Sequence, residues 1–369
     1  MKKETKKAIL SALVLALTLI LMTLLVACGG GATTPAPATP APAADGNATA
    51  TNPAPEAPAN TDPIIIVYYP NESAAVYQDA RDEIERIIHE ATGRPVQSML
   101  TTDYVITIEA ISSGTATIAY LGATGYIEAR NRSASVEPLV VNTGPSGTLE
   151  DALYFSWFAV NYEDADSFRG ADGEFDFSLI EGRRMSFVSP TSTSGFVVPM
   201  GAIEGHFGTD RITDDYVIEG DFFSELLFGQ SHQGALFNLI DGRVDVATVA
   251  DTVFFPGYVE LVSGELNTVG SVYAIREGAE APFHNSVGQR IILMASVPVL
   301  NPPWAINTDF FTPEEIQAIR DALTSEESAN NYLLFTPADM EGVLGWNRKT
   351  GDERFVEVDD AWFNPLRRG

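Results

Sequence analysis

The stretch Met185-Ser186-Phe187-Val188-Ser189-Pro190-Thr191-Ser192-Thr193-Ser194-Gly195 predicts a buried strand and a hydroxyl-rich turn, with an apolar helix from Phe196 to His206 after it. The first N–H groups of a helix have no intrahelical partner and carry partial positive charge. Ser192, Thr193 and Ser194 add hydroxyl donors, and Gly195 permits close approach to the backbone. The pattern therefore predicts an anion site, with an ordinary Ser/Thr helix cap as the alternative.

Strands and helices alternate on both sides of this stretch. Ile64-Ile65-Ile66-Val67-Tyr68-Tyr69 is a continuous apolar run, typical of a parallel strand covered on both faces. Helical spacing of apolar residues follows from Val76 to Ala91. Further strands are expected at 117–121, 155–160 and 244–249, and a helix at 235–240. This order predicts an α/β fold with parallel sheets, in two lobes, with ligands bound at the turns that follow the strands.

The N-terminus has the features of an export signal. A basic start precedes the almost uninterrupted apolar segment Ile9 to Val26. Leu25-Val26-Ala27-Cys28 resembles the lipobox of bacterial lipoproteins, in which the cysteine becomes the lipidated N-terminus. We expect residues 1–27 to be a lipoprotein signal peptide and Cys28 to carry palmitate-type acyl chains that anchor the protein stably. A membrane-spanning helix is the alternative, since the apolar run approaches spanning length.

Residues 28–61 are expected to form a tether. They are rich in Ala, Pro and Thr, with almost no large apolar residue, so they cannot bury enough surface to fold. Cys28 is the only cysteine of the chain, which excludes an intramolecular disulfide and thiol metal sites.

The chain is strongly acidic. It has 22 Lys+Arg and 50 Asp+Glu, a net charge of −28, and removal of the signal's net +3 leaves −31. Nucleic acid and anionic lipid headgroups are therefore poor partners, because their phosphates would be repelled. A small anion can still bind where local dipoles and hydroxyl groups provide the donors.

Four segments, in order along the chain, point to one family. They are Thr102-Asp103-Tyr104, Ile118-Ala119-Tyr120-Leu121-Gly122, Ser192-Thr193-Ser194-Gly195-Phe196-Val197-Val198-Pro199, and Ser231-His232 with Val244-Asp245-Val246-Ala247-Thr248. Together they resemble the phosphonate-binding family of periplasmic-type binding proteins, the substrate-binding lipoproteins of phosphate, phosphite and phosphonate ABC importers. The likeness runs from about Ile64 to Leu333.

The resemblance implies a two-lobed, periplasmic-binding-protein-like (type II) clamshell with parallel-sheet lobes and two crossovers. We place the crossovers near Asn161 and near Ser296 to Pro298. Lobe 1 would then hold residues 62–160 and 297–369, and lobe 2 residues 161–296.

The resemblance also implies the ligand contacts. The phosphoryl oxygens would be held by Ser192, Thr193, Ser194, Tyr104 and His232, with Tyr120 and Asp251 as further positions. Hydroxyl, phenol, imidazole and backbone donors suit an acceptor-only oxyanion in a desolvated site. With an ordinary pKa of about 6.5, His232 would be protonated more readily beside a bound anion. Alternatively, His232 caps a helix and the two tyrosines fill the core.

Two departures from the family pattern bear on the ligand. Relatives that bind aminoalkyl phosphonates have an aspartate before proline where this chain reads Leu300-Asn301-Pro302-Pro303-Trp304, so that carboxylate is absent. Leu121 stands where some relatives place a second tyrosine. Both changes favour phosphite, phosphate, methylphosphonate or a phosphonate with an uncharged tail.

We therefore expect an extracytoplasmic, lipid-anchored binding protein that delivers a phosphorus oxyanion or phosphonate to the permease and ATPase of an ABC importer. We expect a monomer without metal, cofactor or nucleic-acid partner. The alternatives are a sulfonate or other small anion as ligand, and a sensor or adhesion lipoprotein. A serine-loop hydrolase is disfavoured, because the chain has no Gly-x-Ser-x-Gly elbow and no His-Glu-x-x-His helix.

Overall fold

The computed structural model describes residues 61–71, 77–208, 212–219, 222–254, 257–340, 343 and 345–367. They belong to one compact unit, Pro58–Gly369. The expected signal peptide, Cys28 and nearly all of the tether lie outside the described residues.

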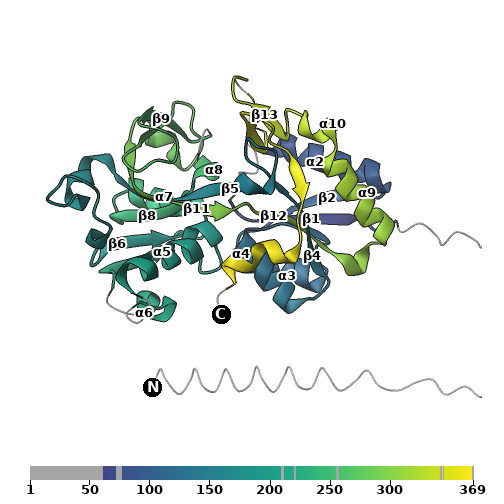
Figure 1. Cartoon of the computed structure of the whole chain (residues 1–369), viewed down its shortest axis with the longest axis horizontal. Helices are drawn as coiled ribbons and strands as arrows, with labels where there is room; N and C mark the ends of the chain where they lie inside the picture. The colour runs from purple at the N-terminus through teal and green to yellow at the C-terminus, as the bar shows by residue number, and fades with distance from the viewer. Residues whose placement is uncertain are drawn as a thin grey trace, which may run out of the picture. The chain divides into compact units, whose positions relative to one another are not determined.

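Two mixed sheets form the framework of this unit (Figure 1). The six-stranded sheet has the order β15-β4-β12-β3-β1-β2. Its strands are β1 (Ile64–Tyr68), β2 (Val96–Leu100), β3 (Ile118–Tyr120), β4 (Val136–Asn142), β12 (Pro303–Asn307) and β15 (Phe355–Glu357). β1 pairs in parallel with β2 and β3, whereas β12 runs antiparallel to β3 and β4.

The seven-stranded sheet has the order β7-β6-β8-β5-β11-β10-β9. Its strands are β5 (Leu153–Asn161), β6 (Arg184–Phe187), β7 (Glu225–Phe228), β8 (Val246–Ala250), β9 (Val259–Ser263), β10 (Val272–Ile275) and β11 (Arg290–Leu300). β6 is parallel to β7 and β8, and the pairs from β8 through β5, β11 and β10 to β9 are antiparallel. The expected α/β class is confirmed, but both sheets are mixed, because the connecting strands β5, β11 and β12 enter them antiparallel to their neighbours.

Helices pack on both sheets. They are α2 (Gln78–Thr92), α3 (Tyr104–Ser113), α4 (Ala123–Arg132), α5 (Val198–Phe207), α6 (Asp214–Glu219), α7 (His232–Ile240), α8 (Asp251–Phe254), α9 (Pro313–Thr324) and α10 (Glu326–Ala329). Around the six-stranded sheet, α2 packs against α9 and α3 against α4. The C-terminal turn η7 (Asp360–Leu366) lies on α4, where Tyr126 Oη donates to Asp360 Oδ1 over 2.6 Å (Figure 1).

The chain changes sheet before β5 and after β11. β5 and β11 pair with each other along nearly their whole lengths within the seven-stranded sheet. The boundaries expected from the sequence, near Asn161 and near Ser296 to Pro298, fall at the far end of β5 and inside β11. The sequence pattern locates these strands, but strand pairing between distant segments decides to which sheet they belong. The division into two lobes that move against each other stays a prediction.

The hydroxyl-rich stretch turns from strand to helix earlier than expected. A π-helical turn, η4 (Thr193–Val197), precedes α5. Ser192 caps it, with its Oγ accepting the Gly195 N–H over 3.1 Å. A Cβ at Gly195 would lie 2.3 Å from Val188 Cγ2, so glycine is needed for the turn to pack against the strand end.

Trp304 anchors the core of the six-stranded sheet. It is fully buried in β12, with ring centroids 5.9 Å from Tyr68, 5.1 Å from Tyr120 and 5.5 Å from Trp346. The side chain therefore packs in the core and joins β12 to the C-terminal segment.

Replacing this side chain should destabilise the fold strongly. We expect Trp304→Ala to lower the free energy of unfolding by about 3–5 kcal/mol, because it removes a buried aromatic side chain and leaves a cavity. Denaturant unfolding measures the change. The control Val262→Ala, at a side chain that is 53% exposed, should change stability by less than about 0.5 kcal/mol. Similar effects for both variants would contradict this account of the core.

Candidate functional site

The hydroxyl loop Ser192–Ser194 meets the N-terminus of α4. Thr124 N donates to Thr193 Oγ1 over 2.9 Å, which joins elements from the two sheets. The close approach requires glycine at the start of α4, because a Cβ at Gly122 would lie 2.9 Å from Thr193 Oγ1. Thr124 Oγ1 is itself buried and has no hydrogen-bond partner among the described residues. A buried hydroxyl without a partner costs about 1–3 kcal/mol, which makes it a candidate ligand contact.

The other two serines of the loop are held by neighbouring elements. Ser192 and Ser194 are buried. The side chain of Ser194 is hydrogen-bonded to Tyr154, and its carbonyl accepts from Ser156 Oγ over 2.6 Å. Burial raises the pKa of Tyr154 well above its ordinary value, so its phenol stays protonated. These contacts fix the loop on β5.

Asn71 makes a second connection between the two sheets. Its Oδ1 accepts from Tyr104 Oη over 2.8 Å and from the backbone N of His232 over 3.3 Å. The Tyr104 ring packs on Tyr69, with 4.1 Å between the ring centroids. The structure thus brings Tyr104 and His232 together through one amide oxygen.

His232 is a neutral donor in this arrangement. It is buried at the start of α7, and its Nδ1 accepts the Ala250 N–H over 3.0 Å. A backbone N–H can only donate, so the ring proton must lie on Nε2. Burial lowers the pKa of His232 to about 3. In the structure the imidazole is therefore neutral and offers one N–H, and its protonation beside a bound anion stays a prediction.

The two remaining residues expected at the site, Asp251 and Tyr120, lie beside the hydroxyl loop, Tyr104 and His232. Asp251 is buried, and its oxygens accept from Phe155 N, Thr252 N and Asn267 Nδ2 at 2.8–2.9 Å. Burial raises its pKa to about 6 although these hydrogen bonds oppose the rise. Tyr120 ends β3 and lines a neighbouring cavity.

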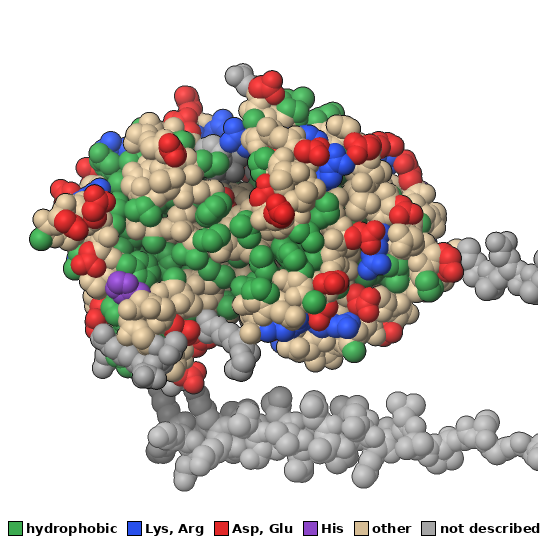
Figure 2. Space-filling view, viewed as in Figure 1, with side chains coloured by type: hydrophobic (Ala, Val, Ile, Leu, Met, Phe, Trp, Pro, Cys, Tyr) green, Lys and Arg blue, Asp and Glu red, His purple; other side chains and the backbone are tan. Residues whose placement is uncertain are grey.

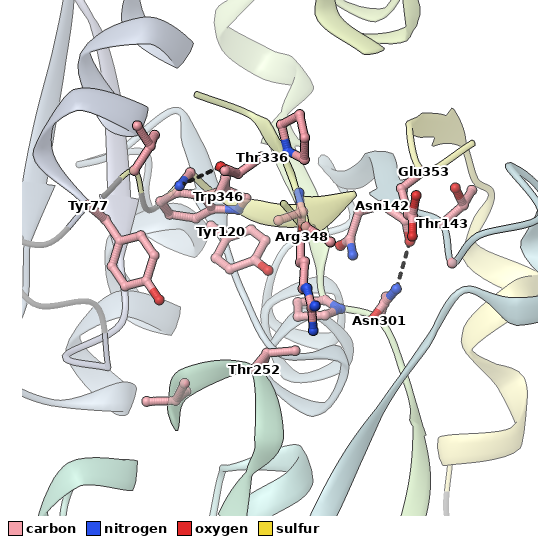
Figure 3. Close-up of a pocket in the computed structure, with 18 of the residues that line it drawn as sticks. Tyr77, Tyr120, Asn142, Thr143, Thr252, Asn301, Thr336, Trp346, Arg348 and Glu353 are labelled. Atoms are coloured by element: carbon pink, nitrogen blue, oxygen red, sulfur yellow. Dashed lines mark hydrogen bonds between the residues drawn. The ribbon is translucent and has the colours of Figure 1, made fainter. Parts of the chain in front are cut away.

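This cavity has a volume of about 270 Å³ (Figure 3). Asn71 belongs both to its wall and to the contacts of Tyr104 and His232. The wall combines residues that follow strands of both sheets with the C-terminal segment: Tyr77, Tyr120, Asn142, Leu153, Thr252, Asn301, Trp346 and Arg348 are among its residues. The hydroxyl loop is not part of this wall, so the cavity lies beside the buried donors.

The surface of the described unit is acidic. Figure 2 shows Asp and Glu side chains scattered over the visible face, with fewer Lys and Arg among them. Among the described residues, no cluster of three or more His, Cys, Asp and Glu side chains could hold a metal ion. In the same part of the chain, no helix has the length and apolar character that crossing a bilayer requires.

Comparison with known proteins identifies the family. The sequence profile described as "ABC transporter, phosphonate, periplasmic substrate-binding protein" matches residues 66–363. The chain belongs to this family. It is the substrate-binding component of an ABC importer and acts outside the cytoplasm, as its sequence motifs predicted.

Individual relatives agree with this assignment. The chain is 23% identical over 300 residues to the phosphate-import protein PhnD of Mycolicibacterium smegmatis, covering 79% of this chain and 87% of that protein. It shares its fold with PhnD1 from Prochlorococcus marinus in complex with methylphosphonate, at 14% identity and a TM-score of 0.60, covering 83% of this chain and 96% of that one. A phosphonate-transporter binding protein from Pseudomonas aeruginosa is 17% identical with a TM-score of 0.58, covering 84% and 85%.

Sequence reasoning missed Asn71 and Thr124. Asn71 follows a strand in a turn of ordinary polar composition, so nothing in the pattern distinguishes it. Thr124 follows Gly122-Ala123 shortly after β3, so glycine and hydroxyl again stand together between a strand and a helix, but in the opposite order to Ser192–Gly195. A search for glycine and hydroxyl residues at strand-to-helix turns in either order would have found it.

The buried imidazole makes stability depend on pH. Below about pH 6.5 the unfolded chain binds a proton on His232 that the folded protein accepts only near pH 3. The stability that comes from a neutral His232 is therefore fully present above pH 6.5 and is lost as pH falls toward 3. Asp251 acts in the opposite direction, because its raised pKa gives stability that is fully present below pH 3.8 and lost as pH rises through 6.

Replacing His232 should make the protein less sensitive to mild acid. We expect His232→Gln, which keeps an acceptor for Ala250 N, to lose less stability than the wild type between pH 7.5 and pH 5.

Thermal unfolding across this pH range measures the difference. His284→Gln, at an exposed histidine, is the matched control and should follow the wild-type curve. Parallel curves for wild type and His232→Gln would show that His232 is not held neutral by the fold.

Proposed function

We propose that this protein captures a phosphorus oxyanion or phosphonate, such as phosphite, phosphate or an alkylphosphonate, between two lobes. The observation that carries the proposal is the meeting of Thr193 with Thr124, one from each sheet, at two helix N-termini. Thr193 Oγ1 accepts from the α4 backbone, so its own proton is free to point elsewhere. Thr124 Oγ1 is buried without a described partner, so an acceptor-only ligand would satisfy it.

The remaining ligand contacts are Ser192, Ser194, Tyr104 and His232, with Tyr120 at the edge toward the cavity. The Tyr104 Oη proton, which Asn71 Oδ1 accepts in the structure, would turn to the ligand on binding. Ser192 and Thr193 both accept backbone hydrogen bonds through their hydroxyl oxygens, which leaves each hydroxyl proton to donate. His232 adds the Nε2 proton. Asp251 accepts from three protein groups, and we propose that it positions β5 and α8 without touching the ligand.

These donors carry no formal charge, but the negative charge of a phosphonate dianion strengthens the hydrogen bonds that it accepts from them. Hydrogen bonds to an ionised acceptor contribute about 1.5–3 kcal/mol each, roughly twice as much as neutral ones. Two helix N-termini add favourable dipoles at the same point. A relative whose structure contains methylphosphonate supports this ligand class.

Ligand binding would favour the closed arrangement of the two lobes. In the structure, contacts of Asn71 and Thr124 already join the sheets, and an oxyanion held from both sides would add to them. We propose capture and release without chemical conversion. The His232 Nδ1 is occupied by a backbone N–H, so this nitrogen cannot act as a general base for a serine.

We further propose that the mature protein is a monomer, that cleavage leaves Cys28 as a lipidated N-terminus, and that residues 28–61 tether the binding unit to the outer face of the membrane. The basic start, the apolar segment and the lipobox-like Leu25-Val26-Ala27-Cys28 support this.

Calorimetric titration of the full-length chain in detergent against phosphite, phosphate, methylphosphonate and sulfate tests the ligand class. We expect Thr193→Val and Tyr104→Phe to weaken binding of the preferred phosphorus compound by about 10- to 100-fold, because each removes one charge-assisted hydrogen bond. Each variant also removes a hydrogen bond within the protein, between Thr193 Oγ1 and Thr124 N or between Tyr104 Oη and Asn71 Oδ1. Each should therefore lose about 1–3 kcal/mol of stability and remain folded. Thr115→Val, at an exposed threonine, is the control and should bind like the wild type. Unchanged affinity in both site variants would refute the site, and tighter binding of sulfate would refute the ligand class.

Lipidation is tested separately by metabolic labelling in a bacterial host. We expect the wild type to incorporate an alkyne analogue of palmitate and to sediment with membranes, and the Cys28→Ser variant to lose the label. Labelling of Cys28→Ser at the wild-type level would place the lipid on another group. An unlabelled wild-type protein that remains in the membrane would favour a spanning helix over residues 9–26.

A further inference from the structure

A half-buried amide lies against the seven-stranded sheet, outside the residues assigned to the ligand. Asn267 stands in the connection between β9 and β10, among residues that are mostly exposed, with a backbone φ of 58°. This is the left-handed region, which asparagine adopts more readily than most other residues. The side chain turns inward, where it meets Trp157 and Asp251.

Hydrogen bonds on both sides fix the orientation of this amide. Trp157 Nε1 donates to Asn267 Oδ1 over 2.8 Å, and Asn267 Nδ2 donates to Asp251 Oδ2 over 2.9 Å. The backbone N of Asn267 donates to Tyr273 Oη over 3.0 Å. An indole N–H can only donate, so the amide oxygen must face Trp157 and the NH2 group must face Asp251. The amide therefore cannot turn over without losing both side-chain bonds.

The Asp251 carboxylate joins the ends of two strands. The pairing of β5 with β8 ends at Ser156 opposite Ala250, and Asp251 lies one residue beyond that pair. Its Oδ1 accepts from Phe155 N over 2.9 Å and from Thr252 N over 2.8 Å. The carboxylate thus extends the connection between the strands by one step and holds the first turn of α8.

These strand ends carry the contacts that hold two proposed ligand-binding residues. Tyr154 and Ser156 lie on either side of the β5 amide that Asp251 binds. Both are hydrogen-bonded to Ser194, the first through its side chain and the second through its carbonyl. The backbone N–H directly before Asp251 donates to Nδ1 of His232. A displaced carboxylate would therefore disturb the support of Ser194 and His232 together.

Asp251 depends on neutral donors. Burial raises its pKa to about 6, so the carboxylate is ionised above that pH. The titratable side chains around it carry no charge there, because burial raises the pKa of Tyr154 and Tyr273 and lowers that of His232 to about 3. Within the described residues, Asn267 is the only side chain that donates to Asp251. Removing one donor from a buried charge is costly, so the carboxylate would move to find another.

We propose that Asn267 is a positioning residue of the anion site and acts through Asp251. By holding the carboxylate, it fixes the strand ends behind Ser194 and His232, so that both donors are oriented before the ligand arrives. The inference depends on the proposed function, because it assumes that the ligand's oxygens are held by these two residues.

Exchanging the two side chains tests this role at pH 9. Asp251→Asn places an NH2 group against the NH2 group of Asn267, and Asn267→Asp places a carboxylate against a carboxylate. The double variant restores a donor–acceptor pair, because the amide at position 251 can donate to a carboxylate at 267 that still accepts from Trp157 Nε1. The amide oxygen at 251 still accepts from the backbone N of Phe155 and Thr252.

Calorimetric titration of the full-length chain in detergent with phosphite, phosphate and methylphosphonate measures the effect, at a temperature at which thermal unfolding shows each variant to be folded. For the probe that the wild type binds most tightly, we expect each single variant to lose at least about tenfold in affinity. The double variant should bind within about threefold of the wild type, since a complementary pair is present again. Asn267→Gly, which keeps the left-handed turn without the amide, replaces a single variant that does not fold and should show the same loss.

A second readout is the pH dependence of Asn267→Asp. Two adjacent buried carboxylates share one proton as pH falls, and the shared O–H donates where the amide did. The ratio of the variant's dissociation constant to that of the wild type should therefore fall from at least about tenfold at pH 9 to less than about threefold at pH 6. Taking the ratio at each pH cancels the ligand's own ionisation.

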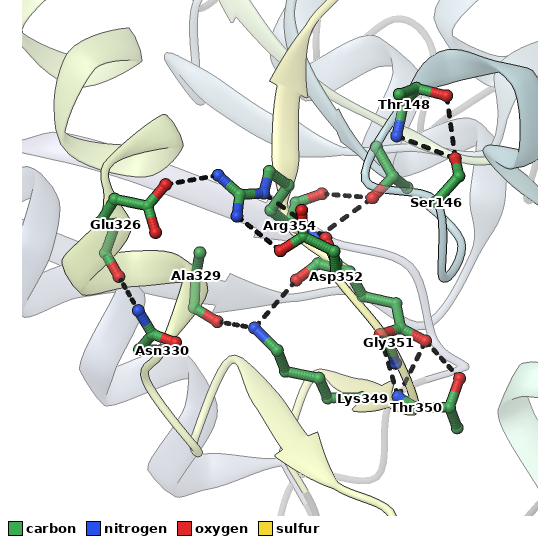
Figure 4. A network of polar contacts seen from close by, with 12 residues as sticks. Ser146, Thr148, Glu326, Ala329, Asn330, Lys349, Thr350, Gly351, Asp352 and Arg354 are labelled. Atoms are coloured by element: carbon green, nitrogen blue, oxygen red, sulfur yellow. Dashed lines mark hydrogen bonds and ion pairs between the residues drawn. The ribbon is translucent and has the colours of Figure 1, made fainter.

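The polar network of the C-terminal segment supplies matched controls (Figure 4). Asn330 is exposed and donates to the Glu326 carbonyl over 2.8 Å, and Asp352 pairs with Arg354 over 2.6 Å. Asn330→Asp and Asp352→Asn make the same chemical changes there and should bind like the wild type.

Three results would overturn the inference: unchanged affinity in Asp251→Asn, a double variant that stays as weak as the single variants, or an affinity ratio for Asn267→Asp that is the same at both pH values. If the wild type binds a phosphorus compound and one of these results is found, only the role of Asn267 fails. If the wild type binds none of the three probes, the proposed function fails and this inference with it.

Discussion

The contact between the α4 N-terminus and the hydroxyl loop is the constraint on which the site depends. Thr124 N and Thr193 Oγ1 can meet only because Gly122 has no side chain and because Ser192 caps a turn that begins directly after β6. Each element comes from a different sheet. Their positions relative to each other therefore depend on the β5 and β11 strands, which carry the chain between the sheets.

At the proposed anion site, dipoles take the place of cations. Helix N-termini, hydroxyls and a neutral imidazole present donor hydrogens without the desolvation cost of a buried Lys or Arg. The backbone N–H of Ala250 fixes the His232 tautomer, so the donor is oriented before the ligand arrives. Such preorganisation favours acceptor-only oxyanions over ligands that also need acceptors from the protein.

The sequence predicted the local elements well and the long-range pairing less well. The apolar run from Ile64, the strand expected at 244–249 and the cap expected near Ser192 are local signals, and the structure has β1, β8 and the Ser192 cap there. The assignment of β5 to the seven-stranded sheet depends on pairing with β8, 88 to 94 residues away, and with β11, more than a hundred residues away. No local pattern encodes such pairing. The same holds for Asn71, whose contacts with Tyr104 and His232 exist only after both sheets have formed. Burial and one backbone hydrogen bond also set the neutral form of His232, and both depend on tertiary structure that the sequence pattern does not encode.

The order of the strands along the chain also bears on how the two halves of the proposed site assemble. The seven-stranded sheet is built from one continuous stretch, Leu153 to Leu300, and can pair its strands as soon as that stretch is available. The six-stranded sheet needs both its first strand, β1, and its last, β15, and η7 packs on the helix that carries Thr124. One half of the proposed anion site can therefore form from a continuous stretch, while the other is supported only once η7 has packed on α4. A chain in which η7 has not folded lacks the support that η7 gives to α4.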